Sequence, residues 1–334
     1  MRGWQFTMTH QPLRLVEQPD PVAAPGEVVI AVEAAGLCHS DVAALDDPEW
    51  LTIVTARPVV LGHEIAGRVI SVGEGVVSVR IGDRVGVCPS APSRPGARRD
   101  GGYATMTTAR AQDTVPIPDG LPASLAAVGT DAGMTAYHAV VCVGRVTTGA
   151  TVGIIGLGGL GQFGAQIALL QGADVYAADT SDDARAAAAA MGLRGTASRI
   201  TDLGVRFDAV IDFAGYGTTT QDALTAISRG GRIVQVGMGV LEASISTSTL
   251  IAKQASLIGS MGGSVDDIAS VYDLMSRGEL TPAIEMIRFE EIPDGLDRLR
   301  RGSVRGRLVA GMHAAALGRV IDGPESIAPE EGKQ

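Results

Sequence analysis

Residues 151–161 read Thr151-Val152-Gly153-Ile154-Ile155-Gly156-Leu157-Gly158-Gly159-Leu160-Gly161, and this stretch decides the fold. The apolar first half predicts a buried strand, and the glycine pattern that follows turns such a strand into the next helix. Gly156 permits the tight turn, Gly158 lets a pyrophosphate approach the backbone, and Gly161 lets helix and sheet pack closely. The helix N-terminus would then hold the pyrophosphate through its unpaired amides. A cofactor-binding role for Gly159 and Leu160 follows from their place in this turn.

The segments after this turn alternate between strand and helix patterns. We expect strands at 174–178, 208–212 and 231–236 and helices at 159–171, 182–191 and 219–228. This alternation predicts an α/β fold with a parallel, doubly wound sheet. Residues 1–120 instead show short strand patterns broken by glycine turns, with a helix from Ser40 to Leu45 and a loop at 89–102. We expect one helix over 126–143 and another over 266–277.

Asp179 ends the second predicted strand, 18 positions beyond Gly161. A carboxylate there accepts hydrogen bonds from both ribose hydroxyls and repels a 2′-phosphate, which favours NAD over NADP. The alternative is a purely structural glycine turn, with Asp179 capping the helix that begins at 182.

The composition excludes several classes of protein. The chain has 334 residues, enough for two domains, and 46% of them are hydrophobic. A net charge of −10 argues against a nucleic-acid partner. The three cysteines are too few and too scattered for a disulfide framework, and no signal peptide or membrane-spanning stretch is evident. We therefore expect a cytoplasmic protein with a small-molecule substrate.

A second motif supplies metal chemistry. Residues 38–41 read Cys38-His39-Ser40-Asp41, and Gly62-His63-Glu64 follows, with His63 25 positions after the cysteine. A thiolate and an imidazole suit zinc, which in catalytic sites keeps three protein ligands and one open position. The alternatives are a buried core cysteine and a hydrogen-bonded structural histidine. The joint context favours a metal site.

These motifs, in this order along nearly the whole chain, resemble the zinc-dependent alcohol dehydrogenases of the medium-chain dehydrogenase/reductase superfamily. Gly82-Asp83-Arg84-Val85 and Gly101-Gly102-Tyr103-Ala104 extend the match. The resemblance implies a GroES-like, mostly-β catalytic domain (1–122 and 264–334) around a Rossmann cofactor domain (123–263). It also implies a homodimer or homotetramer that pairs through an edge strand in 240–260.

The resemblance also implies roles for single residues. Asp131, in Asp131-Ala132-Gly133-Met134-Thr135, takes the place of the usual third zinc ligand, a cysteine. Glu64 would approach the zinc during water exchange, Asp41 would orient His63, and Ser40 would carry the substrate's proton. The alternatives are helix caps at Asp131 and Ser40 and ordinary loop carboxylates at Glu64 and Asp41. Further positions match cofactor contacts in the family: Thr135, Val236, Gly237, Met261 and Arg307, the last alternatively an exposed charge.

Two departures from the family pattern matter. Only Cys88 lies where the family's structural zinc needs four cysteines, which predicts one catalytic zinc and no structural zinc. Ala43 stands where many relatives end their proton relay in a histidine. The proton would then leave through the ribose and His39, or through water.

These features together predict a zinc- and NAD-dependent alcohol dehydrogenase, in which zinc polarises the substrate oxygen, Ser40 takes the proton and nicotinamide takes the hydride. A reductase of C=N or activated C=C bonds and a non-catalytic nucleotide-binding protein are the alternatives. Trp50 and Leu51 are candidates for lining the substrate pocket, and His138 is interpreted as structural.

Overall fold

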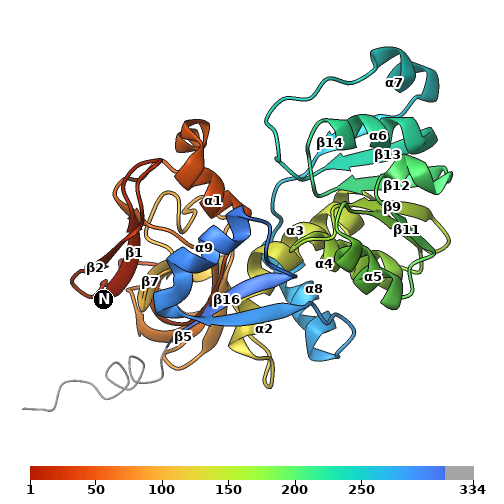
Figure 1. Cartoon of the computed structure of the whole chain (residues 1–334). Coiled ribbons are helices and arrows are strands. Elements are labelled where there is room, and N and C mark those ends of the chain that lie inside the picture. The colour runs from red at the N-terminus through yellow and green to blue at the C-terminus, as the bar shows by residue number, and fades with distance from the viewer. Residues whose placement is uncertain (313–334) are drawn as a thin grey trace, which may run out of the picture.

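The computed structural model describes residues 1–312 and consists of two parts joined by long helical connections (Figure 1). One part is built mainly of strands from the two ends of this range, and the other holds the middle of the chain. This confirms the α/β fold class predicted from the sequence. The domain boundaries at 122/123 and 263/264 stay predictions. Residues 313–334, which belong to the predicted catalytic-domain segment 264–334, lie outside the described residues.

A six-stranded parallel sheet forms the core of the middle part, in the order β11-β10-β9-β12-β13-β14. The first strand in sequence, β9, lies between β10 and β12, so the chain reverses direction across the sheet at this strand. Ligands bind outside the carboxyl ends of the strands at such a reversal. The strands are β9 (Thr151–Ile155), β10 (Asp174–Ala178), β11 (Gly195–Ala197), β12 (Phe207–Asp212), β13 (Ile227–Gln235) and β14 (Ser256–Gly259).

Helices connect these strands, as the alternating pattern predicted. They are α4 (Gly161–Leu170), α5 (Asp182–Ala190), α6 (Thr218–Ala226) and α7 (Thr247–Lys253). Helix α4 is almost entirely buried, which its apolar sequence explains, whereas none of the residues of α7 is buried.

The other part contains a seven-stranded, mainly antiparallel sheet and a three-stranded sheet. The larger sheet consists of β3 (Glu27–Gly36), β5 (Glu64–Val72), β6 (Arg84–Val87), β7 (Met106–Arg110), β8 (Thr114–Pro116), β15 (Ile284–Arg288) and β16 (Arg307–Gly311). The smaller sheet consists of β1 (Arg2–Phe6), β2 (Arg14–Glu17) and β4 (Val59–Val60). Strand β16 pairs with β3, so the end of the described chain completes the sheet that the N-terminal segment begins.

The remaining helices lie around and between the sheets (Figure 1). They are α1 (His39–Asp46), α2 (Ala123–Val128), α3 (Met134–Tyr137), α8 (Val265–Ser276) and α9 (Ile292–Arg300), with short 3₁₀ turns at Pro48–Thr52, Ala111–Asp113, Ile200–Leu203 and Phe289–Glu291. The helix expected over 126–143 is a continuous helical run over 123–143 that includes two π-helical segments, Gly129–Gly133 and His138–Val143.

An ion pair is buried inside the larger sheet. Arg307 of β16 and Glu64 of β5 are 2% and 0% exposed, and the guanidinium donates two hydrogen bonds to the carboxylate. Strand β3 lies between the two strands, and its Gly36 pairs with Glu64 on one side and Val309 on the other. A side chain at Gly36 would overlap the Glu64 carboxylate. The glycine therefore leaves the space through which Glu64 reaches Arg307.

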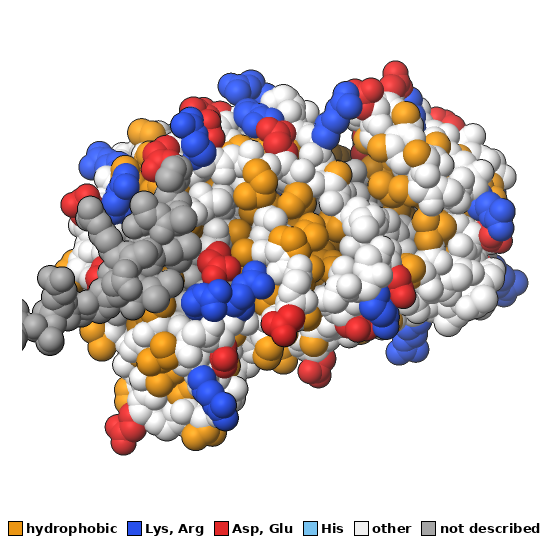
Figure 2. Space-filling view, turned by 90° about the horizontal axis from the view of Figure 1, so that it is seen from below, with side chains coloured by type: hydrophobic (Ala, Val, Ile, Leu, Met, Phe, Trp, Pro, Cys, Tyr) orange, Lys and Arg blue, Asp and Glu red, His pale blue; other side chains and the backbone are white. Residues whose placement is uncertain are grey.

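Charged side chains of both signs are spread over the surface. On the face shown in Figure 2, acidic and basic side chains are intermingled, without a continuous basic area among the described residues. No helix within residues 1–312 is both long enough and apolar enough to cross a bilayer. Strand β14 is an edge of the six-stranded sheet, and Leu257 on it and Ile251 beside it are 40% and 74% exposed. The predicted pairing of two chains through this edge stays untested.

The turn between β9 and α4 generates a stability prediction. A Cβ at Gly161 would overlap the carbonyl oxygen of Gly156, whereas a Cβ at Gly158 would have no atom within 4 Å. Gly161→Ala should therefore lower the free energy of unfolding by at least about 2 kcal/mol, because backbone must move to make room. Gly158→Ala should change it by less than about 0.5 kcal/mol. Urea denaturation of the cofactor-free protein measures both, and equal effects would contradict the packing argument.

The buried ion pair generates a second prediction. Arg307→Met should cost about 3–5 kcal/mol, because the Glu64 carboxylate stays buried without its partner. Adding Glu64→Gln to this variant should restore part of the loss. The control is Arg300→Met, whose partner Asp46 is exposed and where we expect at most about 1 kcal/mol. If the two single variants lose the same stability in thermal unfolding, the buried pair has no special role.

Candidate active site

Four side chains that could hold a metal ion meet where the two parts of the molecule join. Each of Cys38, His63, Glu64 and Asp131 offers a ligand atom within 4.8 Å of the others. Cys38 directly precedes α1, His63 directly precedes β5, and Asp131 belongs to the first π-helical segment. Segments far apart in the sequence thus converge on one point. The fold brings the three predicted ligands, Cys38, His63 and Asp131, close to one another and to Glu64.

The distances suit a tetrahedral ion. Asp131 Oδ2 lies 3.7 Å from Cys38 Sγ and 3.6 Å from His63 Nε2. Two ligands of a tetrahedral zinc, at bond lengths of about 2.0–2.3 Å, are separated by about 3.5 Å. The alternative of a helix cap at Asp131 is wrong, because this residue lies inside the helical run. A π-helical turn is a frequent feature of functional sites.

The charges around two of these atoms favour the forms that bind a cation, the thiolate of Cys38 and the carboxylate of Asp131. Burial opposes ionisation of the Cys38 thiol, yet Arg307 and His63 lower its pKa. Burial likewise opposes ionisation of Asp131, but His63 and Arg307 hold the pKa of this carboxyl below its usual range. A thiolate and a carboxylate are the forms that bind a cation. The donor set therefore fits zinc chemically as well as geometrically.

Asp41 contacts His63 from the side away from Asp131. Its Oδ1 lies 3.4 Å from His63 Nδ1, and its Oδ2 accepts hydrogen bonds from Tyr103 Oη (2.7 Å) and Cys38 N (3.3 Å). Histidine ligands of zinc usually have such a partner, which fixes the ring. Asp41 is 3% exposed and lies in α1, so the alternative of an ordinary loop carboxylate is wrong. The same holds for Glu64, which is buried in β5.

The sequence analysis assigned no role to Tyr103. Its side chain is fully buried and its only described side-chain hydrogen bond is to Asp41. The Gly101-Gly102-Tyr103-Ala104 motif contained this residue, but the contact joins residues 62 positions apart and has no signal in local spacing.

Ser40 and His39 lie beside the cluster. Ser40 Oγ is 3.4 Å from His63 Nε2, and α1 is capped by Cys38, so the alternative of a cap at Ser40 is wrong. His39 and Ser40 both line a cavity that extends along the glycine turn. Burial and the charge of Arg307 lower the pKa of His39.

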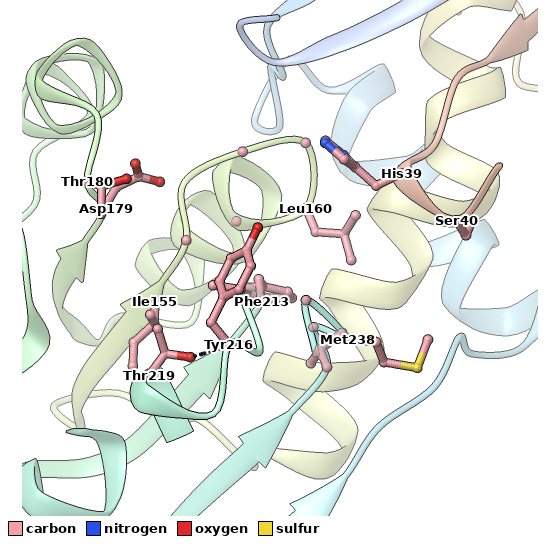
Figure 3. A pocket seen from close by; sticks show the side chains of 18 of the residues that line it. His39, Ser40, Ile155, Leu160, Asp179, Thr180, Phe213, Tyr216, Thr219 and Met238 are labelled. Carbon is pink, nitrogen blue, oxygen red and sulfur yellow. Dashed lines mark hydrogen bonds between the residues drawn. The ribbon is translucent and has the colours of Figure 1, made fainter. Parts of the chain in front are cut away.

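The first of two cavities at this site runs along the glycine turn. It has a volume of about 480 Å³ and is lined by residues that include Cys38, Ser40, Gly156, Gly158–Gly161, Asp179 and Arg307. Asp179 and Thr180 lie at one end, His39 and Ser40 at the other, and Leu160 between them (Figure 3). Three residues of the segment after β12, Phe213, Tyr216 and Thr219, line the same cavity and were not predicted from the sequence.

Asp179 holds the glycine turn. Its carboxylate accepts hydrogen bonds from the amides of Leu157 (2.7 Å) and Ser181 (2.8 Å). The cap of α5 is Ser181, so the alternative that Asp179 caps this helix is wrong. Its ribose contact remains a prediction, supported by its place on the cavity wall.

Arg307 is not an exposed charge, the alternative left open by the sequence. Besides Glu64, its Nη2 donates a 3.2 Å hydrogen bond to Asp131. A Cβ at Gly159 would lie 2.6 Å from its Nη1, so the same guanidinium also borders the glycine turn. Arg307 thus links the metal-ligand cluster to the first cavity.

A second cavity of about 710 Å³ opens on the other side of the cluster. Thr135, Val236, Gly237 and Met261 line it, together with the metal-ligand residues. Trp50 lines both cavities, as expected for a pocket residue, but Leu51 lines neither and packs against the hydrophobic core. Ile53, two residues further along, takes part instead.

His138 lies outside both cavities. Its Nδ1 is 3.0 Å from Asp267, which also accepts from Cys142 Sγ (3.5 Å) and caps α8 through Ser264. Asp267 is thus already engaged by its neighbours, and this agrees with the structural interpretation of His138.

Comparisons with known proteins match dehydrogenases. Residues 24–119 match the family model described as alcohol dehydrogenase GroES-like domain, and residues 159–277 match that described as zinc-binding dehydrogenase. An alcohol dehydrogenase of Geobacillus stearothermophilus is 30% identical over 325 residues, which cover 89% of this chain and 95% of that protein.

Solved structures give the same result. The acetophenone reductase from Geotrichum candidum, solved in complex with NAD, superposes with a TM-score of 0.85 at 30% identity, covering 93% of this chain and 96% of that one. The alcohol dehydrogenase of Aeropyrum pernix superposes with a TM-score of 0.86 at 26% identity, covering 93% and 100%. This chain therefore belongs to the zinc-binding alcohol dehydrogenase family, with its GroES-like domain and its medium-chain dehydrogenase/reductase fold.

Proposed function

We propose that this protein is a zinc-dependent alcohol dehydrogenase that interconverts an alcohol and its ketone or aldehyde with NAD. The observation that carries the proposal is the junction of the two cavities at Cys38 and Ser40. A cofactor in the first cavity and a substrate in the second would meet beside the ligand cluster. One zinc ion per chain would be held by Cys38, His63 and Asp131.

Two features of the first cavity and one of the second support NAD binding. Open space lies in front of Gly158, where a pyrophosphate needs to approach the backbone. Asp179 stands at the far end, where its negative charge would repel a 2′-phosphate. The Ser260 hydroxyl is buried and has no hydrogen-bond partner among residues 1–312, and it lies next to Val236 and Gly237 in the second cavity. A nicotinamide carboxamide near Gly237 would give it one.

When bound, zinc supplies a Lewis acid for the substrate oxygen and NAD supplies the ring that accepts hydride. The chain's own residues move the proton and hold the geometry. Ser40 Oγ, in contact with His63, would take the proton of the substrate hydroxyl. In the absence of a histidine at Ala43, the proton would leave through the ribose and His39, which lines the first cavity with Ser40, or through water.

Turnover and metal content test the proposal together. We expect reduction of NAD with at least some members of a panel of primary, secondary and cyclic alcohols, with activity lost after zinc removal by a chelator and regained with zinc. Activity only on C=N or activated C=C bonds would favour the reductase alternative. NAD binding without turnover of any such compound would favour the non-catalytic alternative.

Asp131 gives the first prediction from this proposal. Asp131→Ala should lower zinc occupancy and rate, because it removes a charged ligand. Asp131→Cys should retain most of the zinc, because a thiolate is an equally suitable ligand. Elemental analysis and rates of both variants decide the point. Full zinc content and rate in Asp131→Ala would leave Asp131 with no ligand role, and two tight zinc ions per wild-type chain would contradict the ligand count.

Asp179 gives the second prediction from this proposal. Asp179→Ser combined with Thr180→Arg removes the charge that repels a 2′-phosphate and adds a partner for it. The preference for NAD over NADP, measured as the ratio of the two kcat/KM values, should fall by at least about tenfold. Because Asp179 also holds the glycine turn, Asp179→Asn serves as the control. A loss that is equal for both cofactors would mean that Asp179 acts only on the turn, and a wild-type preference for NADP would overturn the assignment.

A further inference from the structure

The loop at 89–102, which is too poor in cysteine for a structural zinc, places an arginine in the second cavity. Arg94 lines this cavity, as do Trp50, Ile53 and Ala97. It is the only lysine or arginine among the described residues that line the cavity.

Arg94 differs from the other two arginines of its loop. Arg99 forms an ion pair with Glu27 at 2.9 Å, and Arg98 donates to the carbonyl of Pro92 at 3.4 Å. Arg94 is half-buried as a residue, and its guanidinium makes no hydrogen bond or ion pair with any residue in 1–312. Its donors are not among the buried unpartnered atoms of the described chain, so they are open to a group that enters the cavity.

The backbone holds Arg94 in this place. Its φ of 37° lies in the left-handed region, which is uncommon for residues other than glycine. The amide of Arg94 bonds to the carbonyl of Ala91 (3.0 Å), and its carbonyl accepts from Ala97 (3.1 Å) and Arg98 (2.9 Å). This turn fixes where the side chain leaves the loop, on the wall of the cavity.

The other charges in the cavity leave Arg94 uncompensated. Asp131 is the only carboxylate among its described lining residues, and the proposed zinc would neutralise Asp131 and Cys38 together. A single guanidinium matches the single charge of a carboxylate, and it can bind both oxygens at once. A phosphate dianion would leave one charge without a partner here.

We propose that Arg94 binds a carboxylate of the substrate, so that this enzyme acts on hydroxy acids or oxo acids whose carboxylate lies remote from the reacting carbon. The proposal rests on the proposed function, since it assigns the second cavity to the substrate. Trp50 and Ile53 would contact the hydrocarbon chain between the two ends.

The test compares matched substrates that differ only in the carboxylate. The hydroxy acid 6-hydroxyhexanoate is compared with 1-hexanol, and 5-hydroxyhexanoate with 2-hexanol, each time as the ratio of the two kcat/KM values. We expect a ratio above about 10 in the wild type for at least one pair, and a fall of about 10- to 100-fold in Arg94→Met, mainly through KM, as for one lost charged hydrogen-bonding pair. Arg94→Lys keeps the charge but loses the planar guanidinium that can bind both carboxylate oxygens, so its ratio should lie between those of the wild type and Arg94→Met. Arg98→Met, in the same loop but outside the cavity, should leave the ratio unchanged.

A binding experiment separates this proposal from the proposed function. The dissociation constant of hexanoate is measured by calorimetry with the wild type, Arg94→Met and Arg98→Met, since any carboxylate bound at the zinc alone is insensitive to Arg94. Weaker binding only in Arg94→Met supports the carboxylate site even if no alcohol is turned over. Equal binding in all three proteins, equal substrate ratios in wild type and Arg94→Met, or a larger effect of Arg94→Met on inorganic phosphate than on hexanoate would overturn it.

Discussion

The buried pair of Arg307 and Glu64 is the interaction on which the rest of the site depends. It connects β16 with β5 across β3, and Arg307 also donates to Asp131 and borders Gly159. One guanidinium therefore joins the larger sheet, the ligand cluster and the glycine turn. A buried ion pair gives little net stability in itself, because desolvation offsets much of the attraction. Its value here is positional, since it fixes three segments from distant parts of the sequence relative to one another.

The topology explains why the two cavities meet at this pair. Strand β9 lies between β10 and β12, and the chain leaves the sheet at its carboxyl end through the glycine turn. The larger sheet contributes the opposite wall, because β3 and β5 end and begin next to Cys38 and His63. One hydrophobic cluster joins the two layers, because it includes Ala34, Ala66 and Val309 of the larger sheet as well as Val152, Ile154 and Val234 of the parallel sheet. This shared core holds the two cavity walls at a fixed separation.

Much of the fold and of the candidate site could be predicted from the sequence. The contacts that could not be predicted share one physical reason. The strands at 151–155 and 174–178 match their predicted limits, because apolar runs bounded by glycine or charge are local signals. The predicted ligands Cys38, His63 and Asp131 converge, because their motifs are short and distinctive. The contact between Tyr103 and Asp41 and the contacts of Arg307 had no such signal. They depend on which strands become neighbours, and strand β7 and strand β1, with few apolar residues, were not predicted either.

The charge balance of the site links the ligand role proposed for Asp131 to Arg94. A divalent zinc with Cys38, Asp131 and a neutral His63 carries no net charge, just as it would with two cysteines and a histidine, so the aspartate leaves the electrostatics of the ligand set unaltered. Glu64 and Arg307 likewise cancel each other. In the second cavity Arg94 is then left as the one charged side chain among the described lining residues without an opposite charge. The carboxylate proposed for the substrate would supply that charge and could accept two hydrogen bonds from the guanidinium.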